Sequence, residues 1–263
     1  MDIEKVLKAV IEEKGYNDSQ IKKVHGGASS ASTYYIKKTN EKNYYIKIQE
    51  VNNDCSYLLS EKIAYEWLKD YLLVAEVIFY ELYDTYEVLC ISEIMGSDFK
   101  KIKKSINSNE IIKLYARGLK KLHDLPLGNC HIVSDLDNKL EKALERVRKG
   151  LVNYDDFEDE YKGILPKDLY KLLINKRPLE EELVFTHGDY CFDNIILSSD
   201  KSIGYIDLGN SGLACKYQDI AIAVRSIKHD YGDEYLDIFF KEYGLSQIDQ
   251  SKIEFYIILD EFS

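Results

Sequence analysis

The sequence predicts an α+β protein of two lobes, with an antiparallel sheet and one helix in the first lobe and mainly helices in the larger second lobe. Three observations support this prediction. Short β-rich runs dominate the first 95 residues, helical periodicity dominates afterwards, and one β-rich segment near residue 190 interrupts the helical part. We therefore predict two domains, residues 1–95 and residues 96–263.

The individual elements follow from local patterns. The first 15 residues, MDIEKVLKAVIEEKG, have the pattern of a charged amphipathic helix. Strands are predicted for the runs rich in Tyr, Ile and Val, namely TYYIKK, NYYIKIQ, EVIFYEL and YEVLCISEI. Helices are predicted for YLLSEKIAYEWLKDYL, for the segment around residues 111–122, and for residues 134–150, 166–175, 215–229, 233–243 and 250–261.

Composition excludes several classes of protein. The formal net charge of −11 repels phosphate backbones and anionic lipid, so we expect neither nucleic acid nor a membrane as partner. The chain has no run of about 18 apolar residues and no apolar signal segment at its start, which predicts a cytoplasmic protein. Its five cysteines are scattered without a C-x-x-C pair, so we expect reduced thiols.

The segment VFTHGDYCFDNIIL (184–197) concentrates polar side chains between two apolar runs that predict short strands. A hairpin whose turn is centred between Asp200 and Lys201 would set Asn194 opposite Asp207. Opposed residues have Cβ atoms roughly 5 Å apart, so an amide oxygen and a carboxylate could share one cation. Mg²⁺ prefers such oxygen ligands and completes its shell with water and phosphate oxygens. The hairpin therefore predicts a magnesium site.

Asp189 lies in the loop that leaves the strand LVF, five residues before Asn194. A carboxylate at this place can orient a hydroxyl group and accept its proton. The neighbouring His187 has no nucleophile elbow and no second histidine close to it in the sequence. We therefore interpret His187 as a structural, hydrogen-bonded residue.

The strand NYYIKIQ alternates, so Tyr45 and Lys47 share one face and Ile46 takes the other. A lysine in a strand often only faces solvent. In the following helix, however, Glu61 falls on an apolar stripe that includes Tyr65, and a carboxylate there is unfavourable unless it is paired. We therefore predict an ion pair between Lys47 and Glu61 that could hold a cation against phosphate groups.

The chain resembles the aminoglycoside phosphotransferases, especially their 3′-phosphotransferase branch, which have a protein-kinase-like fold. HGDYCFDN (187–194) is similar to the family's H-G-D-x-x-x-x-N catalytic loop, and IDLG (206–209) is similar to its counterpart of the kinase metal-binding motif. YQDIA (217–221), RSI (225–227) and ILDEF (258–262) match the 3′ branch in order and spacing. The resemblance covers nearly the whole chain. It implies transfer of the γ-phosphate of ATP to an aminoglycoside hydroxyl, with the 3′-hydroxyl favoured, and antibiotic resistance as the result.

The resemblance also implies roles for the residues singled out above. Asp189 would be the catalytic base. Asn194 and Asp207 would bind Mg²⁺. Lys47, held by Glu61, would contact the α- and β-phosphates. Whether GTP also serves as donor stays open.

Further nucleotide contacts are implied in the first lobe. The loop HGGASSAST (25–33) would cover the phosphates, with Ser29 as its main contact, because Gly and Ser amides can bind an anion. Tyr45 would stack on adenine, although packing within the sheet is an equal alternative. The segment ISEI would be the hinge between the lobes, with backbone groups of Ser92 and Ile94 at the edge of the base.

Aminoglycosides are polycations, so the resemblance implies an acidic acceptor site. The predicted acceptor-binding residues are carboxylates of the segment NYDDFEDEY and of the last residues of the chain, namely Asp155, Glu158, Asp260, Glu261 and the carboxylate of Ser263. Without the resemblance, such acidic runs would be interpreted as solvated loops. Each exposed ion pair contributes only about 0.2–1 kcal/mol, so several would have to act together.

Three positions depart from the 3′ branch. Asn210 stands where the branch has Arg, Cys215 stands where it has Asp, and His229 stands where some members have Glu. We expect Asp219 to brace the catalytic loop. The departures leave open how efficient catalysis is and which acceptor is used.

Two other functions stay open at this point. The chain could be a kinase of another small alcohol, such as a choline-like or sugar substrate, or a nucleotide-binding protein with little catalysis. The D-E-F sequence near the C-terminus disfavours the first, and the complete set of predicted site residues disfavours the second. We expect a monomer or a weak dimer.

Overall fold

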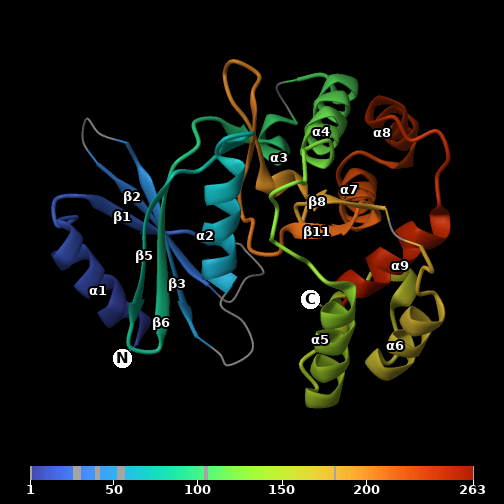
Figure 1. Ribbon diagram of the computed structural model, residues 1–263, viewed down its shortest axis with the longest axis horizontal. Helices are drawn as coiled ribbons and strands as arrows, with labels where there is room; N and C mark the ends of the chain where they lie inside the picture. Colours follow the sequence, from blue (N-terminus) through green and yellow to red (C-terminus); the bar gives the residue numbers. More distant parts are fainter. Residues whose placement is uncertain are drawn as a thin grey trace. The chain divides into compact units, whose positions relative to one another are not determined.

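The structure, a computed structural model, describes residues 2–25, 31–38, 42–51, 57–103, 106–180 and 182–262, apart from the side chain of residue 156. Figure 1 shows a sheet-rich part and a helical part, which confirms the predicted α+β class. The chain divides into two units. The first comprises Met1–Ser97 and Ile196–Asn210, and the second comprises Asp98–Ile195 and Ser211–Ser263.

The first unit is built on a five-stranded antiparallel sheet with the order β1-β2-β3-β6-β5. Its strands are β1 (Gln20–Lys23), β2 (Ser32–Lys37), β3 (Tyr44–Glu50), β5 (Val77–Tyr83) and β6 (Tyr86–Ser92). The helices are α1 (Ile3–Lys14) and α2 (Tyr57–Leu68). Helix α1 begins after Asp2, which accepts a hydrogen bond from the backbone of Lys5, and ends at Gly15 in a left-handed conformation.

Alternation along β3 decides which side chains enter the core. Ile46 and Ile48 are fully buried in a cluster with Val6 and Val10 of α1. Burial of such a side chain contributes about 1.5–3 kcal/mol, so the register of β3 is strongly specified. Lys47 therefore lies on the opposite face of the sheet, as the sequence predicted.

A hairpin late in the chain completes the first unit. β9 (Ile195–Leu197) and β10 (Ile203–Tyr205) belong to a sheet with the order β4-β10-β9-β7, in which β4 is Leu73–Val74 and β7 is Ser97–Asp98. β10 pairs in parallel with β4, with Gly204 opposite Leu73. This pairing joins residues 196–210 to the first unit, which the predicted domain boundaries did not include. The division into domains at residue 95 stays a prediction.

The predicted register of this hairpin is wrong by one residue near its turn. The N–H of Ser198 donates to the carbonyl of Ser202 at 3.0 Å, so these two residues are opposite each other. Lys201 has φ 66° and forms the bulge of a three-residue loop. The register therefore gives no support for setting Asn194 opposite Asp207, and their shared cation stays a prediction.

The second unit is mainly helical. Its α-helices are α3 (Phe99–Ile102), α4 (Ser108–His123), α5 (Leu136–Lys149), α6 (Pro166–Asn175), α7 (Tyr217–Asp230), α8 (Leu236–Tyr243) and α9 (Gln250–Asp260). Its 3₁₀ helices are η1 (Tyr154–Asp156), η2 (Asp159–Tyr161), η3 (Phe192–Asn194) and η4 (Asp233–Tyr235). β8 (Leu183–Thr186) pairs antiparallel with β11 (Gly212–Cys215), a strand that the sequence analysis missed because its residues were assigned to a loop and the start of a helix.

Aromatic packing anchors the segment after β8 to α4. The ring of Tyr115 is fully buried, and its centroid lies 4.6 Å from the ring centroid of Tyr190 and 4.2 Å from that of Phe192. The hydroxyl groups of Tyr115 and Tyr190 each donate to the backbone carbonyl of the other residue. These contacts fix both the rings and the backbone of the loop.

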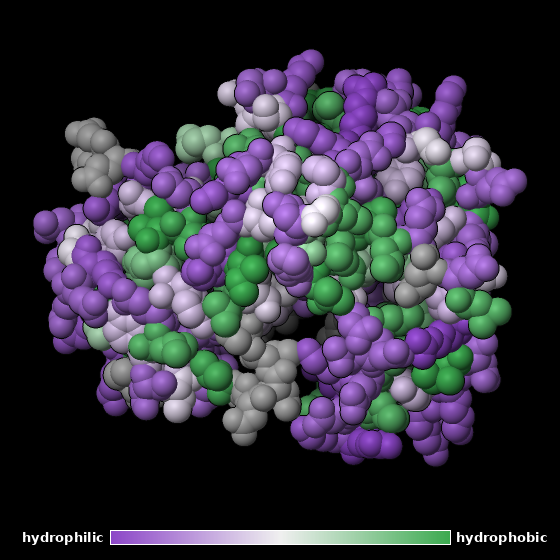
Figure 2. Space-filling view, in the orientation of Figure 1, coloured by the Kyte–Doolittle hydropathy of each residue, from purple (hydrophilic) through white to green (hydrophobic). Residues whose placement is uncertain are grey.

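The surface carries both hydrophilic and hydrophobic side chains. Figure 2 shows mostly hydrophilic side chains, with hydrophobic residues gathered in separate patches. Within the described residues, no helix is long and apolar enough to cross a membrane.

Candidate active site

The loop after β8 is held by a buried carboxylate. Asp219 on α7 is fully buried and accepts hydrogen bonds from the N–H groups of His187, at 2.6 Å, and Gly188, at 2.8 Å. Burial raises the pKa of Asp219, but its hydrogen bonds with His123 and with the backbone of His187 outweigh it, so the pKa lies below its usual value. Asp219 therefore braces this loop as a charged group, as predicted.

The braced loop presents Asp189 and Asn194 together. The side-chain nitrogen of Asn194 donates to the backbone carbonyl of Asp189 at 3.0 Å and to its Oδ2 at 2.9 Å. Both hydrogen bonds use Nδ2 of Asn194, and neither uses its side-chain oxygen Oδ1. His187 is fully buried and accepts from the N–H of Asp189 through Nδ1, in agreement with the structural role predicted for it.

The predicted ion pair of the first unit is present. Lys47 Nζ lies 2.6 Å from Oε1 and 2.8 Å from Oε2 of Glu61, whose side chain is fully buried. Asp207 Oδ1 lies 2.9 Å from the same nitrogen. Burial alone would lower the pKa of Lys47, but the two carboxylates raise it to about 12. Lys47 therefore stays a cation at neutral pH.

The turn that carries Asp207 is strained and tightly packed. Asp207 has φ 61°, a left-handed conformation that costs a non-glycine residue about 1–2 kcal/mol. Two residues later, a Cβ atom on Gly209 would lie 2.3 Å from the ring of Tyr57, so only glycine fits there. The Tyr57 hydroxyl also donates to Asp207 Oδ1 at 3.3 Å. The turn is thus fixed by contacts with the start of α2.

The predicted adenine contacts all lie in the first unit. Tyr45 is half-buried, and its ring lies 5.1 Å from that of Tyr35. The N–H of Ser92 donates to the carbonyl of Glu76 at 2.9 Å, so the prediction for Ser92 can apply to its carbonyl but not to its N–H. The side chain of Ile94 packs where Gly204 has no Cβ. Roles in nucleotide binding remain predictions for these residues, and Ser29 lies outside the described residues.

Three of the predicted acceptor-binding carboxylates surround one arginine. Arg225 on α7 pairs with Asp260, and its guanidinium nitrogens lie 3.7 Å from Glu158 Oε1 and 4.0 Å from Glu261 Oε1. The N–H of Glu158 also donates to Glu261 Oε2 at 3.3 Å. We call Arg225, Glu158, Asp260 and Glu261 the acidic cluster. Asp155 is exposed in η1, with no ion pair to this cluster among the described residues, and Ser263 lies outside the described residues.

A cavity of about 200 Å³ opens beside the acidic cluster. Its wall includes the loop after β8 and the C-terminal half of α7. The lining residues are Lys100, Glu158, Cys191, Phe192, Asp193, Arg225, Ser226, His229 and Asp230. Of these residues, the sequence predicts an acceptor contact only for Glu158. His229 departs from the 3′ branch, and the R-S-I motif predicts no role for Arg225 or Ser226.

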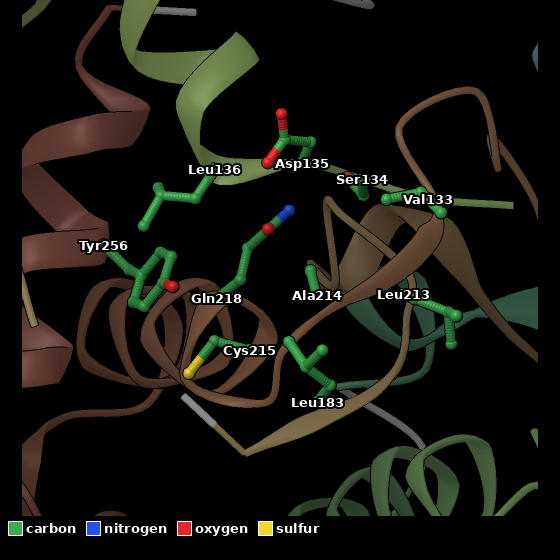
Figure 3. Close-up of a pocket in the computed structure, with 10 residues that line it drawn as sticks. All are labelled: Val133, Ser134, Asp135, Leu136, Leu183, Leu213, Ala214, Cys215, Gln218 and Tyr256. Carbon is green, nitrogen blue, oxygen red and sulfur yellow. The ribbon is translucent and has the colours of Figure 1, made fainter. Parts of the chain in front are cut away.

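A second cavity, of about 130 Å³, is lined in part by Cys215, one of the departures from the 3′ branch. Figure 3 shows its lining from β8, β11, α5, α7 and α9, with Cys215 and Gln218 among the side chains. Cys215 is 1% exposed in the wall of this mostly apolar cavity. It is therefore separate from the cavity beside the acidic cluster, whose lining does not include it.

Comparisons with known proteins identify the family of the chain. The model of the phosphotransferase enzyme family matches residues 20–256. The chain is 38% identical over 200 residues to an aminoglycoside 3′-phosphotransferase of Niallia circulans, with 76% of each chain covered. It is 36% identical over 241 residues to one of Enterococcus faecalis, with 89% of this chain and 90% of the relative covered. The crystal structure of an aminoglycoside-3′-phosphotransferase of type VIII has a TM-score of 0.87 at 25% identity and covers 99% of both chains.

Proposed function

The chain belongs to the phosphotransferase enzyme family, and we propose that it transfers the γ-phosphate of ATP to a hydroxyl group of an aminoglycoside antibiotic, with the 3′-hydroxyl favoured. Modification of the drug would confer resistance. The observation that carries the proposal is the pair of carboxylates, Glu61 and Asp207, that hold the ammonium group of Lys47. The chain that holds it is similar in sequence to such enzymes. A lysine held in this way presents a fixed positive charge to phosphate oxygens.

In the proposed reaction, the acceptor hydroxyl oxygen forms a bond to the γ-phosphorus while the bond from that phosphorus to the bridging oxygen of ADP breaks. Asp189 orients the hydroxyl group and takes its proton. Asn194 holds the Asp189 carboxylate through its side-chain nitrogen. Lys47 neutralises charge on the α- and β-phosphates, so positioning and electrostatics supply most of the rate enhancement.

Asn194 and Asp207 are the proposed ligands of Mg²⁺. An amide oxygen and a carboxylate fit this ion, which prefers few protein oxygens and keeps waters and phosphate oxygens. When bound, Mg²⁺ would supply charge neutralisation on the nucleotide phosphates.

The acidic cluster is the proposed site for amino groups of the drug. Glu261 Oε1 is buried and accepts no hydrogen bond from the described residues, so an ammonium group would give it a donor. The adjacent cavity of about 200 Å³ is smaller than the roughly 300–1,000 Å³ typical of drug-sized ligands, so it would hold only part of the acceptor.

The proposal is tested by ADP release with Mg-ATP against aminoglycosides that carry or lack the 3′-hydroxyl, with GTP as an alternative donor. We expect turnover with the 3′-hydroxyl compounds and only background without that group. Turnover independent of the 3′-hydroxyl would contradict the proposed position of transfer. Absence of turnover with every drug, although ATP is bound, would contradict the acceptor class.

Acceptor binding should depend on pH through Glu261. Burial raises the pKa of this carboxyl to about 7, against the opposing effect of Arg225. It is therefore mostly neutral at pH 6 and mostly charged at pH 8, where it attracts a cationic drug more strongly. Replacement of Glu261 by Gln should leave the KM for the drug nearly unchanged at pH 6 and raise it up to about fivefold at pH 8. If the KM of the variant divided by that of the parent does not grow between pH 6 and pH 8, this contact is excluded.

A further inference from the structure

Tyr65 connects two parts of the Lys47 site. It lies on α2 one turn after Glu61, and its side chain is 1% exposed. Its hydroxyl group donates to Glu61 Oε1 at 3.0 Å and accepts from the N–H of Asp207 at 3.1 Å. The Tyr65 hydroxyl therefore donates to Glu61, the partner of Lys47, and accepts from the backbone of Asp207, the proposed metal ligand.

The strained turn makes this second bond important. Asp207 holds a left-handed conformation, φ 61°, and a non-glycine residue keeps such a conformation only where its surroundings fix it. The hydrogen bond to Tyr65 fixes the backbone of Asp207, and the bond to Lys47 Nζ fixes its carboxylate. Without the hydroxyl group, the Asp207 N–H would lose this acceptor, and the carboxylate would lose one of the restraints on its direction.

We propose that the Tyr65 hydroxyl is a positioning group, which sets the direction of the Asp207 carboxylate. The inference rests on the proposed function and deepens it, since it makes metal binding at Asp207 depend on a side chain of α2. The hydroxyl group touches neither the nucleotide nor the metal in this role. It acts through Asp207.

Replacement of Tyr65 by Phe tests the hydroxyl group while it keeps the buried ring. Loss of a hydrogen bond to a charged group weakens what depends on it by about tenfold or more. We expect about tenfold weaker binding of Mn²⁺ to the ADP complex, measured from the electron paramagnetic resonance signal of unbound Mn²⁺. We expect the affinity for ADP without metal to change less than about twofold, and kcat to fall about tenfold at an unchanged KM for the drug.

Tyr34 provides a matched control. It is a buried tyrosine of the same unit, 3% exposed, and its hydroxyl group donates to a carboxylate outside the site, Glu4, at 3.3 Å. Replacement of Tyr34 by Phe should leave Mn²⁺ binding within about twofold of the parent. Equal losses in the two variants would reduce the effect of Tyr65 to general stability and overturn the proposal.

Two other results would also overturn it. One is a Tyr65→Phe variant with unchanged Mn²⁺ binding, and the other is an equal loss of ADP affinity with and without metal. The metal measurement needs no acceptor. A parent protein that phosphorylates no aminoglycoside but shows the selective loss of Mn²⁺ binding in the variant would therefore refute the proposed function and support the role of Tyr65.

Discussion

Replacement of Asp189 by Asn should lower kcat by about 10²–10⁴-fold, the range that a positioned general base supplies. The variant keeps the size of the side chain and a possible contact with Asn194, but it cannot take the proton of the acceptor hydroxyl. Affinity for ATP should stay within about threefold of the parent, because the carboxylate has no proposed contact with the nucleotide. Single-turnover phosphoryl transfer and nucleotide titration measure the two effects separately.

Asp200 is a suitable control for this replacement. It is an exposed carboxylate in the turn of the β9–β10 hairpin, where it accepts from the N–H of Ser202 at 2.9 Å. Asp200→Asn should keep kcat within about twofold. If Asp189→Asn retained a tenth or more of the parental kcat, Asp189 would not be the general base.

Replacement of Lys47 by Met should both lower activity strongly and destabilise the fold. It removes the charge proposed to bind the phosphates, a change that typically lowers kcat by about 10²–10³-fold. It also leaves Glu61 buried without its cation, and breaking a buried pair in this way typically costs about 3–5 kcal/mol in the free energy of unfolding. Denaturant unfolding and ADP release measure the two consequences.

The double variant Lys47→Met, Glu61→Met separates stability from catalysis. Apolar side chains in place of both charges remove the unpaired carboxylate, so at least half of the lost unfolding free energy should return. Activity should not return, because the charge proposed to bind the phosphates is still absent. A double variant no more stable than Lys47→Met would show that Glu61 is not the source of the destabilisation.

The sequence predicted those parts of the site that depend on local periodicity. Alternation along β3 placed Lys47 on the face opposite Ile46, and the apolar stripe of α2 demanded a partner for Glu61. Both follow from the repeats of strand and helix, which a single sequence displays. The family match confirms the resemblance that was stated on the catalytic-loop and metal motifs.

Contacts between distant segments could not be predicted in this way. The pairing of β10 with β4 involves only two residues of each strand, Gly204 and Tyr205 with Leu73 and Val74, too few to leave a pattern. The left-handed conformation of Lys201 shifted the hairpin register, although lysine is not a residue that signals such a bulge. The apolar stripe includes Tyr65, but nothing in the sequence shows that a strained turn supplies an N–H to its hydroxyl.

The acidic cluster already contains a tethered cation. Because Arg225 is paired with Asp260 and lies close to Glu158 and Glu261, these carboxylates are partly compensated before any acceptor arrives. In the proposed site, an incoming ammonium group would compete with this resident guanidinium, and only the difference between the two cations would appear as affinity. Selectivity among drugs would then depend on how well their amino groups bind these carboxylates while Arg225 remains bound to them.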